Sequence, residues 1–129
     1  MNDLDGLVAA ARDVRERAHA PYSRFFVGAA LSAGGRTFTG VNIENASYPL
    51  SVCAERNAVA AMVTAGERQV DAVAVVTDAP APTPPCGGCR QVLSEFARPD
   101  TVVVSQTLAG QRAEWTVAGL LPDAFVFDR

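Results

Sequence analysis

The sequence predicts an α/β fold: one domain over residues 1–129, with a mixed sheet of about five strands and helices packed on it. Two observations support this prediction. Apolar residues spaced three and four apart alternate along the chain with short runs rich in β-branched residues, and clusters of glycine and proline separate the two patterns. A chain of 129 residues, of which 49% are hydrophobic, suits one core rather than two.

The first half of the chain predicts a helix, a strand pair and a second helix. Apolar residues from Asp3 to Ala18 follow the spacing of an amphipathic helix, which "HAPYS" then ends. The segments 26–32 and 37–43 predict two strands, because the "AGGR" between them suits a tight turn. Residues 55–66 are rich in helix formers, and their last residue, Gly66, is a favourable helix stop.

The second half predicts three more strands and two helices. The apolar run 70–78 is typical of a strand that is buried on both faces. A proline-rich loop follows, and residues 86–97 predict a third helix. Segments 101–105 and 113–117 flank a turn at Gly110 as two further strands, and "VAGLL" predicts a short helix after them.

Composition narrows the kind of ligand. A net charge of -3 and a pI near 5.0 give no basic face for a polyanion, so we expect no nucleic-acid partner. No apolar stretch is long enough to span a bilayer, and the N-terminus does not resemble a secretory signal. Three cysteines are an odd number for a disulfide framework, so we expect reduced thiols, a cytoplasmic location and a small-molecule ligand.

The three cysteines predict a metal site. Cys53 precedes the second predicted helix, and Cys86 and Cys89 stand at the start of the third, where helix N-termini favour thiolates. Three protein ligands without a fourth are typical of a catalytic zinc, one per chain, whose open position holds water. Taken alone, the C-x-x-C pair also suits a redox dithiol or a structural zinc knot. His19 is distant in sequence, and a solvated histidine is its ordinary interpretation.

Two charged residues follow Cys53. The carboxyl of Glu55, on the first turn of its helix, can face the open position of the metal and transfer protons there; the plainer interpretation is a carboxylate that complements the helix dipole. Arg56, three residues after Cys53, can offset the negative charge of three thiolates around zinc, and it is equally well interpreted as a surface arginine.

The motifs "CAE" and "PCGGC" resemble the zinc-dependent nucleoside deaminases. Together with "PYSRFFVGAAL", "GVNIENASYP", "CAERNA", "PCGGCRQVL" and "LLPDAF", they resemble cytidine deaminase of the small homotetrameric type over nearly the whole chain. This resemblance implies a cytidine deaminase-like fold. It also implies that the protein converts cytidine and 2'-deoxycytidine to uridine and 2'-deoxyuridine in pyrimidine salvage. It further implies that Cys53, Cys86 and Cys89 bind zinc and that Glu55 shuttles protons. Asn42 and Glu44 would hold the ribose, and Phe25 and Phe125 would contact the base. Phe125 and the segment around Ala46 and Tyr48 would reach sites of neighbouring subunits.

The residues support part of this independently. Asn42 and Glu44 are two apart, so on an extended segment both side chains project to one face. The sequence departs from the family pattern at Phe26, Val41 and Asn57, and Phe26 stands beside the expected base wall. Two other functions remain open: blasticidin-S deaminase, which "NIEN" and "PYSRF" argue against, and a non-enzymatic module stabilised by a fully protein-ligated zinc.

Overall fold

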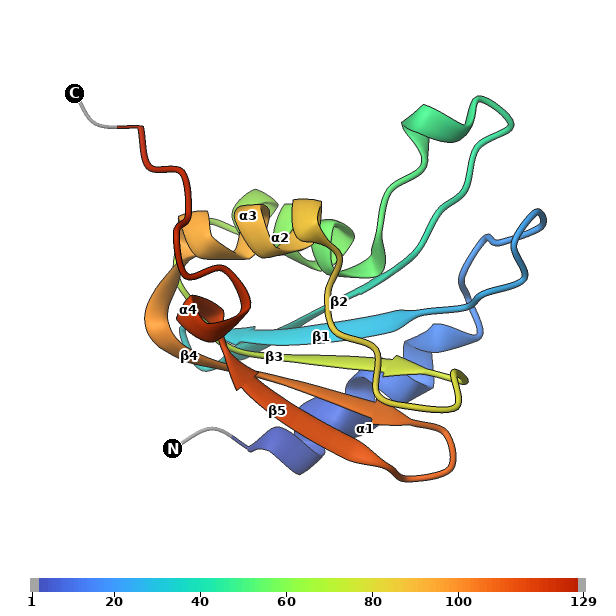
Figure 1. Ribbon diagram of the computed structural model, residues 1–129, viewed down its shortest axis with the longest axis horizontal. Coiled ribbons are helices and arrows are strands. Elements are labelled where there is room, and N and C mark those ends of the chain that lie inside the picture. Colours follow the sequence, from blue (N-terminus) through green and yellow to red (C-terminus); the bar gives the residue numbers. More distant parts are fainter. Residues whose placement is uncertain (1–2, 128–129) are drawn as a thin grey trace.

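Five strands form one mixed sheet in the computed structural model, which describes residues 3–127 (Figure 1). The strand order is β2-β1-β3-β4-β5; β3 and β4 are parallel, and the other neighbouring pairs are antiparallel. The elements in chain order are α1 (Leu4–Arg15), β1 (Gly28–Ala33), β2 (Arg36–Val41), the 3-10 turn η1 (Tyr48–Leu50), α2 (Ala54–Thr64), β3 (Val70–Thr77), α3 (Gly87–Phe96), β4 (Ala97–Thr107), β5 (Arg112–Thr116) and α4 (Val117–Leu120). This confirms the predicted α/β class and the five-stranded mixed sheet.

Capping and glycine chemistry set several boundaries. The Asp3 carboxylate accepts a hydrogen bond from the Gly6 N–H at 2.9 Å, which caps the start of α1. Gly34 and Gly35 join β1 to β2 with φ angles of 58° and 76°, the positive values that a tight two-residue hairpin turn requires. Gly66, with φ at 97°, follows the end of α2.

The helices cover both faces of the sheet. Helix α1 packs on one face, and α2, α3 and α4 pack on the other (Figure 1). Strand β3 serves both cores: Ala72, Ala74 and Val76 belong to the cluster under α1, whereas Val73 and Val75 belong to the cluster under α2 and α3. The expectation of a strand buried on both faces is therefore confirmed.

The topology brings the starts of two helices together. Strands β2 and β3 are both antiparallel to β1, so they point the same way and their carboxyl ends lie at one edge of the sheet. The chain leaves β2 and then enters α2, and it leaves β3 and then enters α3. In open sheets with helical crossovers, the carboxyl ends of the strands are where ligands bind.

Two segments differ from the sequence prediction. Strand β4 begins at Ala97, directly after α3, although only residues 101–105 have a clear strand pattern. The intervening residues, Pro99 with a charged residue on either side, are exposed, and the β3–β4 register shifts beside them. Residues 42–52 form a projecting arm, closed at its base by the Ile43–Val52 bridge and containing the 3-10 turn (Figure 1).

Over residues 3–127, no helix is both long and apolar enough to cross a membrane.

Candidate active site with a cysteine cluster

The three cysteines meet where α2 and α3 begin. Cys53 and Cys86 are the N-cap residues of the two helices, and Cys89 lies in the first turn of α3, as the sequence predicts. Their sulfur atoms lie within 4.8 Å of one another, and the Sγ atoms of Cys53 and Cys86 are 3.7 Å apart. A tetrahedral zinc with Zn–S bonds of ~2.3 Å would place its sulfurs about 3.8 Å apart, so the cluster fits this metal.

The cluster readily holds negative charge. Hydrogen bonding with Cys89, then with Cys86, and the positive charge of Arg56 lower the pKa of Cys53 to about 6, against the opposing effect of burial. The same pairing with Cys53 and its own burial raise the pKa of Cys89. A thiolate at Cys53 is therefore stabilised by the neighbouring thiols, and a metal held by the cluster would take the place of their protons.

Glu55 is a buried carboxyl beside this cluster. Glu55 lies on the first turn of α2 and is 6% exposed. The group of side chains placed to hold a metal ion consists of the three cysteines and does not include Glu55. Burial, followed by the negative charge of Cys53, raises the pKa of Glu55 to about 7. A carboxyl with this pKa can both accept and release a proton near neutral pH.

A cavity of about 430 Å³ opens beside the cluster at the carboxyl end of the sheet. Its walls come from the loop before β1, the arm, the start of α2, strand β3 and the loop before α3. The predicted site residues that line it are Phe25, Asn42, Glu44, Tyr48, Cys53, Glu55 and Cys86. This volume is within the range of ~300 to 1,000 Å³ that is usual for small-molecule sites.

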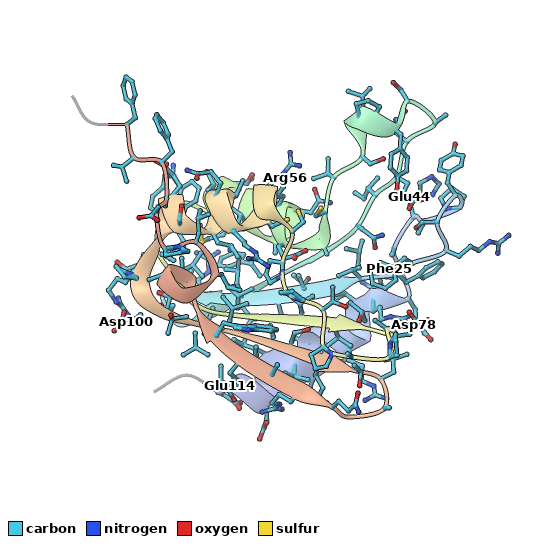
Figure 2. All side chains as sticks on the ribbon, in the orientation of Figure 1. Phe25, Glu44, Arg56, Asp78, Asp100 and Glu114 are labelled. Atoms are coloured by element: carbon cyan, nitrogen blue, oxygen red, sulfur yellow. The ribbon has the colours of Figure 1, made fainter. Side chains whose placement is uncertain are left out.

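Asn42 and Glu44 line the cavity together, and both already bond to the loop before β1. Asn42 Oδ1 accepts from the Val27 N–H at 2.9 Å, and its Nδ2 donates to the Phe25 carbonyl at 2.7 Å. The Glu44 carboxylate is 7% exposed and accepts hydrogen bonds from the segment Tyr22–Ser23. Figure 2 shows Glu44 and Phe25 at the right of the view, where the arm and the loop before β1 lie. The two predicted sugar residues thus also fix the backbone around Phe25.

Four predicted site residues lie outside the cavity lining; one of them, Cys89, is buried within the cysteine cluster. Phe125 is 71% exposed and borders a separate hollow of about 480 Å³ near α3 and α4. Ala46 is exposed on the arm. Arg56 is exposed on the outer side of α2 (Figure 2); over residues 3–127 no hydrogen bond joins its guanidinium to a thiol, and it acts on Cys53 through its charge.

The departures from the family pattern have local partners. The Asn57 side chain donates to the Val41 carbonyl at 2.8 Å, so these two positions join α2 to the end of β2. The Phe26 ring lies 5.9 Å from the guanidinium carbon of Arg15, whose Nε also donates to the Phe26 carbonyl at 2.9 Å. Phe26 therefore contributes to holding the loop behind Phe25.

Sequence reasoning missed two supporting residues. Arg90 on α3 donates from Nε to the Pro85 carbonyl at 2.7 Å and from its terminal nitrogen to the Leu120 carbonyl, which fixes the backbone just before Cys86. Ser23 lines the cavity and bonds to Glu44. Both stand inside quoted motifs, "PCGGCRQVL" and "PYSRFFVGAAL", but only their contacts show what they hold.

Comparisons with known proteins agree with this site. A family model of the zinc-binding region of cytidine and deoxycytidylate deaminases matches residues 1–106. The chain is 50% identical over 124 residues to a cytidine deaminase of Halalkalibacterium halodurans, covering 95% of this chain and 94% of the relative. A cytidine deaminase of Sporosarcina psychrophila is 47% identical over 124 residues, with coverages of 95% and 91%.

Solved structures lead to the same family. A crystal structure of cytidine deaminase from Burkholderia pseudomallei matches with a TM-score of 0.91 and 45% identity, covering 97% of this chain and 100% of that one. Cytidine deaminase from Mycobacterium tuberculosis matches with a TM-score of 0.85 and 37% identity, with coverages of 98% and 100%. These matches confirm the resemblance, the fold and the zinc cofactor expected from the motifs. The chain therefore belongs to the cytidine deaminases, a family of zinc-dependent hydrolytic enzymes.

Proposed function

We propose that this chain converts cytidine and 2'-deoxycytidine to uridine and 2'-deoxyuridine, releasing ammonia, as a step of pyrimidine salvage. The observation that carries the proposal is a buried carboxyl, Glu55, which lines the same small cavity as Cys53 and Cys86 of the three-thiol cluster. A cytoplasmic location suits these three unpaired thiols, because zinc ligation requires them to stay reduced.

The cluster and Glu55 divide the chemistry. Cys53, Cys86 and Cys89 would hold the zinc, which supplies Lewis-acid activation of water when it is bound. Glu55 accepts a proton from the attacking water, transfers it to ring nitrogen 3 of the base, and later assists departure of the amine from carbon 4. A pKa of about 7 suits both the accepting and the donating step.

The rest of the cavity orients a nucleoside. Phe25, 37% exposed, offers an aromatic wall to the base, and Asn42 and Glu44 offer polar groups to the sugar hydroxyls. The described lining contains two carboxyls and no lysine or arginine side chain. A phosphate on the sugar would therefore meet negative charge without a basic partner, and this favours nucleosides over nucleotides.

The active form is proposed to be a homotetramer with shared sites. Phe125, Val126 and Phe127 are each more than 70% exposed, and Tyr48 and Leu50 on the arm are at least 60% exposed. Large apolar side chains exposed together are typical of association surfaces. Phe125 borders a hollow away from its own chain's cavity, which supports its insertion at the site of a neighbouring subunit. The exposed segment around Ala46 and Tyr48 is proposed to reach a neighbouring site as well, while Tyr48 also lines the cavity of its own chain.

Replacing Glu55 by glutamine tests the catalytic assignment. The variant should keep zinc and the fold but lose at least the ~10²- to 10⁴-fold of rate that general acid-base catalysis supplies. Zinc content, circular dichroism and an ultraviolet assay with cytidine measure these three properties. Turnover near the wild-type rate would rule out the proton-transfer role, and loss of zinc would make Glu55 a ligand or its support.

A substrate panel tests the nucleoside assignment. The ultraviolet assay is run with cytidine, cytosine, cytidine monophosphate and blasticidin S, and cytidine should be the best substrate by kcat/KM. Equal use of the monophosphate would remove the sugar-site argument, and preference for blasticidin S would assign the chain to the other branch of deaminases.

Sedimentation and kinetics together test the assembly. The wild type should sediment as a tetramer, and Phe125→Ala should raise KM even in protein that stays assembled. An active monomer at assay concentration would contradict the shared-site proposal.

A further inference from the structure

The Glu44 carboxylate is held by a short segment of the chain. Its Oε1 accepts the backbone N–H groups of Tyr22 at 2.9 Å and Ser23 at 3.2 Å, and its Oε2 accepts the hydroxyl of Ser23. A carboxylate offers about four acceptor positions, so these three donors leave about one free. Since Glu44 lines the cavity, the free position is available to one hydroxyl of a bound ligand.

Ser23 links this carboxylate to the aromatic wall. The Ser23 hydroxyl also accepts the backbone N–H of Phe25 at 3.0 Å. Arg24, between them, has a φ of 59°, the left-handed conformation that turns the chain back toward the Ser23 side chain. The hydroxyl has one proton, and donation to Glu44 uses it. Ser23 therefore fixes its neighbours and has no second proton to give to a ligand.

The Ser23 hydroxyl controls the orientation of Glu44 rather than the fold. The two backbone donors hold only Oε1, whereas the Ser23 side chain is the donor that holds Oε2 among the described contacts of this carboxylate. Without the hydroxyl, Oε2 is free to rotate away from the ligand. The loop keeps its other attachments, because Asn42 still bonds to the backbone of Phe25 and Val27.

We propose that Ser23 is a positioning residue that aims the Glu44 carboxylate at a sugar hydroxyl, and so determines the preference for a ligand whose sugar ring carries a hydroxyl. The inference rests on the proposed nucleoside function. It assigns to "PYS" a chemical role in sugar selection, exerted through Glu44 and not by contact with the reacting atoms.

A double-mutant cycle tests the proposal with Ser23→Ala, Glu44→Gln and their combination. A hydrogen bond to a charged group is worth about 10- to 100-fold in equilibrium, so Ser23→Ala should raise KM for cytidine by about that factor while kcat stays within about 3-fold. In the Glu44→Gln background, Ser23→Ala should cost less than about 2-fold, because its target is already altered. Ser23→Thr, which keeps the hydroxyl, should restore most of the loss.

Two comparisons separate positioning from general damage. With 2',3'-dideoxycytidine, which lacks both ring hydroxyls, Ser23→Ala should lower kcat/KM clearly less than with cytidine, because only the bond from the Phe25 N–H to the Ser23 hydroxyl is then lost. Thr64→Ala is a matched control, because the Thr64 hydroxyl donates to the Ala60 carbonyl near the end of α2, outside both hollows, and this variant should behave as wild type. Calorimetric binding of uridine, which is not consumed, should weaken by the same factor as KM rises.

The possible failures are distinguishable. Multiplicative losses in the double variant, or equal losses with cytidine and 2',3'-dideoxycytidine, would overturn the role of Ser23 while leaving the deaminase function intact. Absence of cytidine turnover and of uridine binding in the wild type itself would instead overturn the proposed function, and the Ser23 inference with it.

Discussion

Gly40 sets how closely β2 approaches the start of α2, and its replacement by alanine should disturb the metal site. A Cβ at this position would lie 2.4 Å from the Ala54 carbonyl oxygen and 2.4 Å from the Ala58 nitrogen, whereas ordinary contacts begin near 3.4 Å. Both atoms belong to the backbone of α2, so no side chain can move aside. The helix must shift from the strand by about 1 Å.

A shift of this size matters because Cys53 and Glu55 stand at the start of the same helix, while Cys86 and Cys89 stand on α3. Metal sites tolerate ligand displacements of about 0.2 Å, and a misplacement of about 1 Å commonly costs ~10²-fold in rate. We expect Gly40→Ala to lose zinc affinity and about 10²-fold or more in kcat/KM, with ~1 to 3 kcal/mol of stability.

Gly88→Ala is the matched control for this experiment. Gly88 lies between Cys86 and Cys89 in the first turn of α3, but a Cβ added there meets nothing within 4 Å over the described residues. Zinc content by atomic absorption and kcat/KM for cytidine are measured on both variants. Full zinc and full activity in Gly40→Ala, or an equal loss in Gly88→Ala, would refute the packing argument.

Three further predictions follow from the cluster, from Glu44 and from the core. Cys89→Ala should lose zinc and activity together, since two thiolates cannot hold the metal in a catalytic site, and zinc analysis beside the assay checks this. Hydrogen bonds from the Ser23 side chain and from the backbone of Tyr22 and Ser23, with the charge of His19, lower the pKa of Glu44 below 4.5. The ionised Glu44 carboxylate should therefore contribute its full stabilisation above pH 4.5, and this stabilisation should disappear as the pH falls through the lower pKa that Glu44 has in the folded protein. Over that acidic range the thermal midpoints of wild type and Glu44→Gln should converge. Over residues 3–127, Ser105 Oγ is the buried side-chain polar atom without a hydrogen-bond partner, so Ser105→Ala should be neutral or stabilising by up to about 1 kcal/mol in urea unfolding at fixed protein concentration.

The sequence predicted those parts of the molecule in which one local pattern determines the outcome. Strand β3 is an unbroken apolar run, and the cysteines stand at helix starts that glycine, proline and spacing indicate. The meeting of Cys53 with Cys86 depends on β2 and β3 pointing the same way, which is a property of the sheet and not of either motif. Motif spacing could therefore suggest the metal site, but only the topology explains it.

Other features were beyond sequence reasoning because they arise from contacts between distant segments. Arg98, Pro99 and Asp100 belong to β4 although charged residues and proline are poor strand formers, since the pairing of Ala97 with Val70 extends the strand against its local pattern. The hydrogen bonds that Arg90 donates to the Pro85 and Leu120 carbonyls likewise join positions up to 30 residues apart. No periodicity marks such a residue, because its partners are backbone carbonyls that every residue type possesses.

The two hydrogen bonds of the Asn42 side chain to the loop before β1 limit which positions can be changed to alter the substrate preference of this enzyme. Its amide holds the Phe25 carbonyl on one side and the Val27 N–H on the other, while it also faces the cavity. A library that randomises position 42 to accept modified sugars would at the same time release the backbone around Phe25, the wall proposed for the base, so gains in sugar tolerance would be masked by weaker binding at that wall. Among the described residues, Tyr48 and Ser51 line the same cavity with no hydrogen bond to that loop, the Ser51 hydroxyl accepting the Asn45 N–H within the arm instead, so they are the better positions at which to begin diversification.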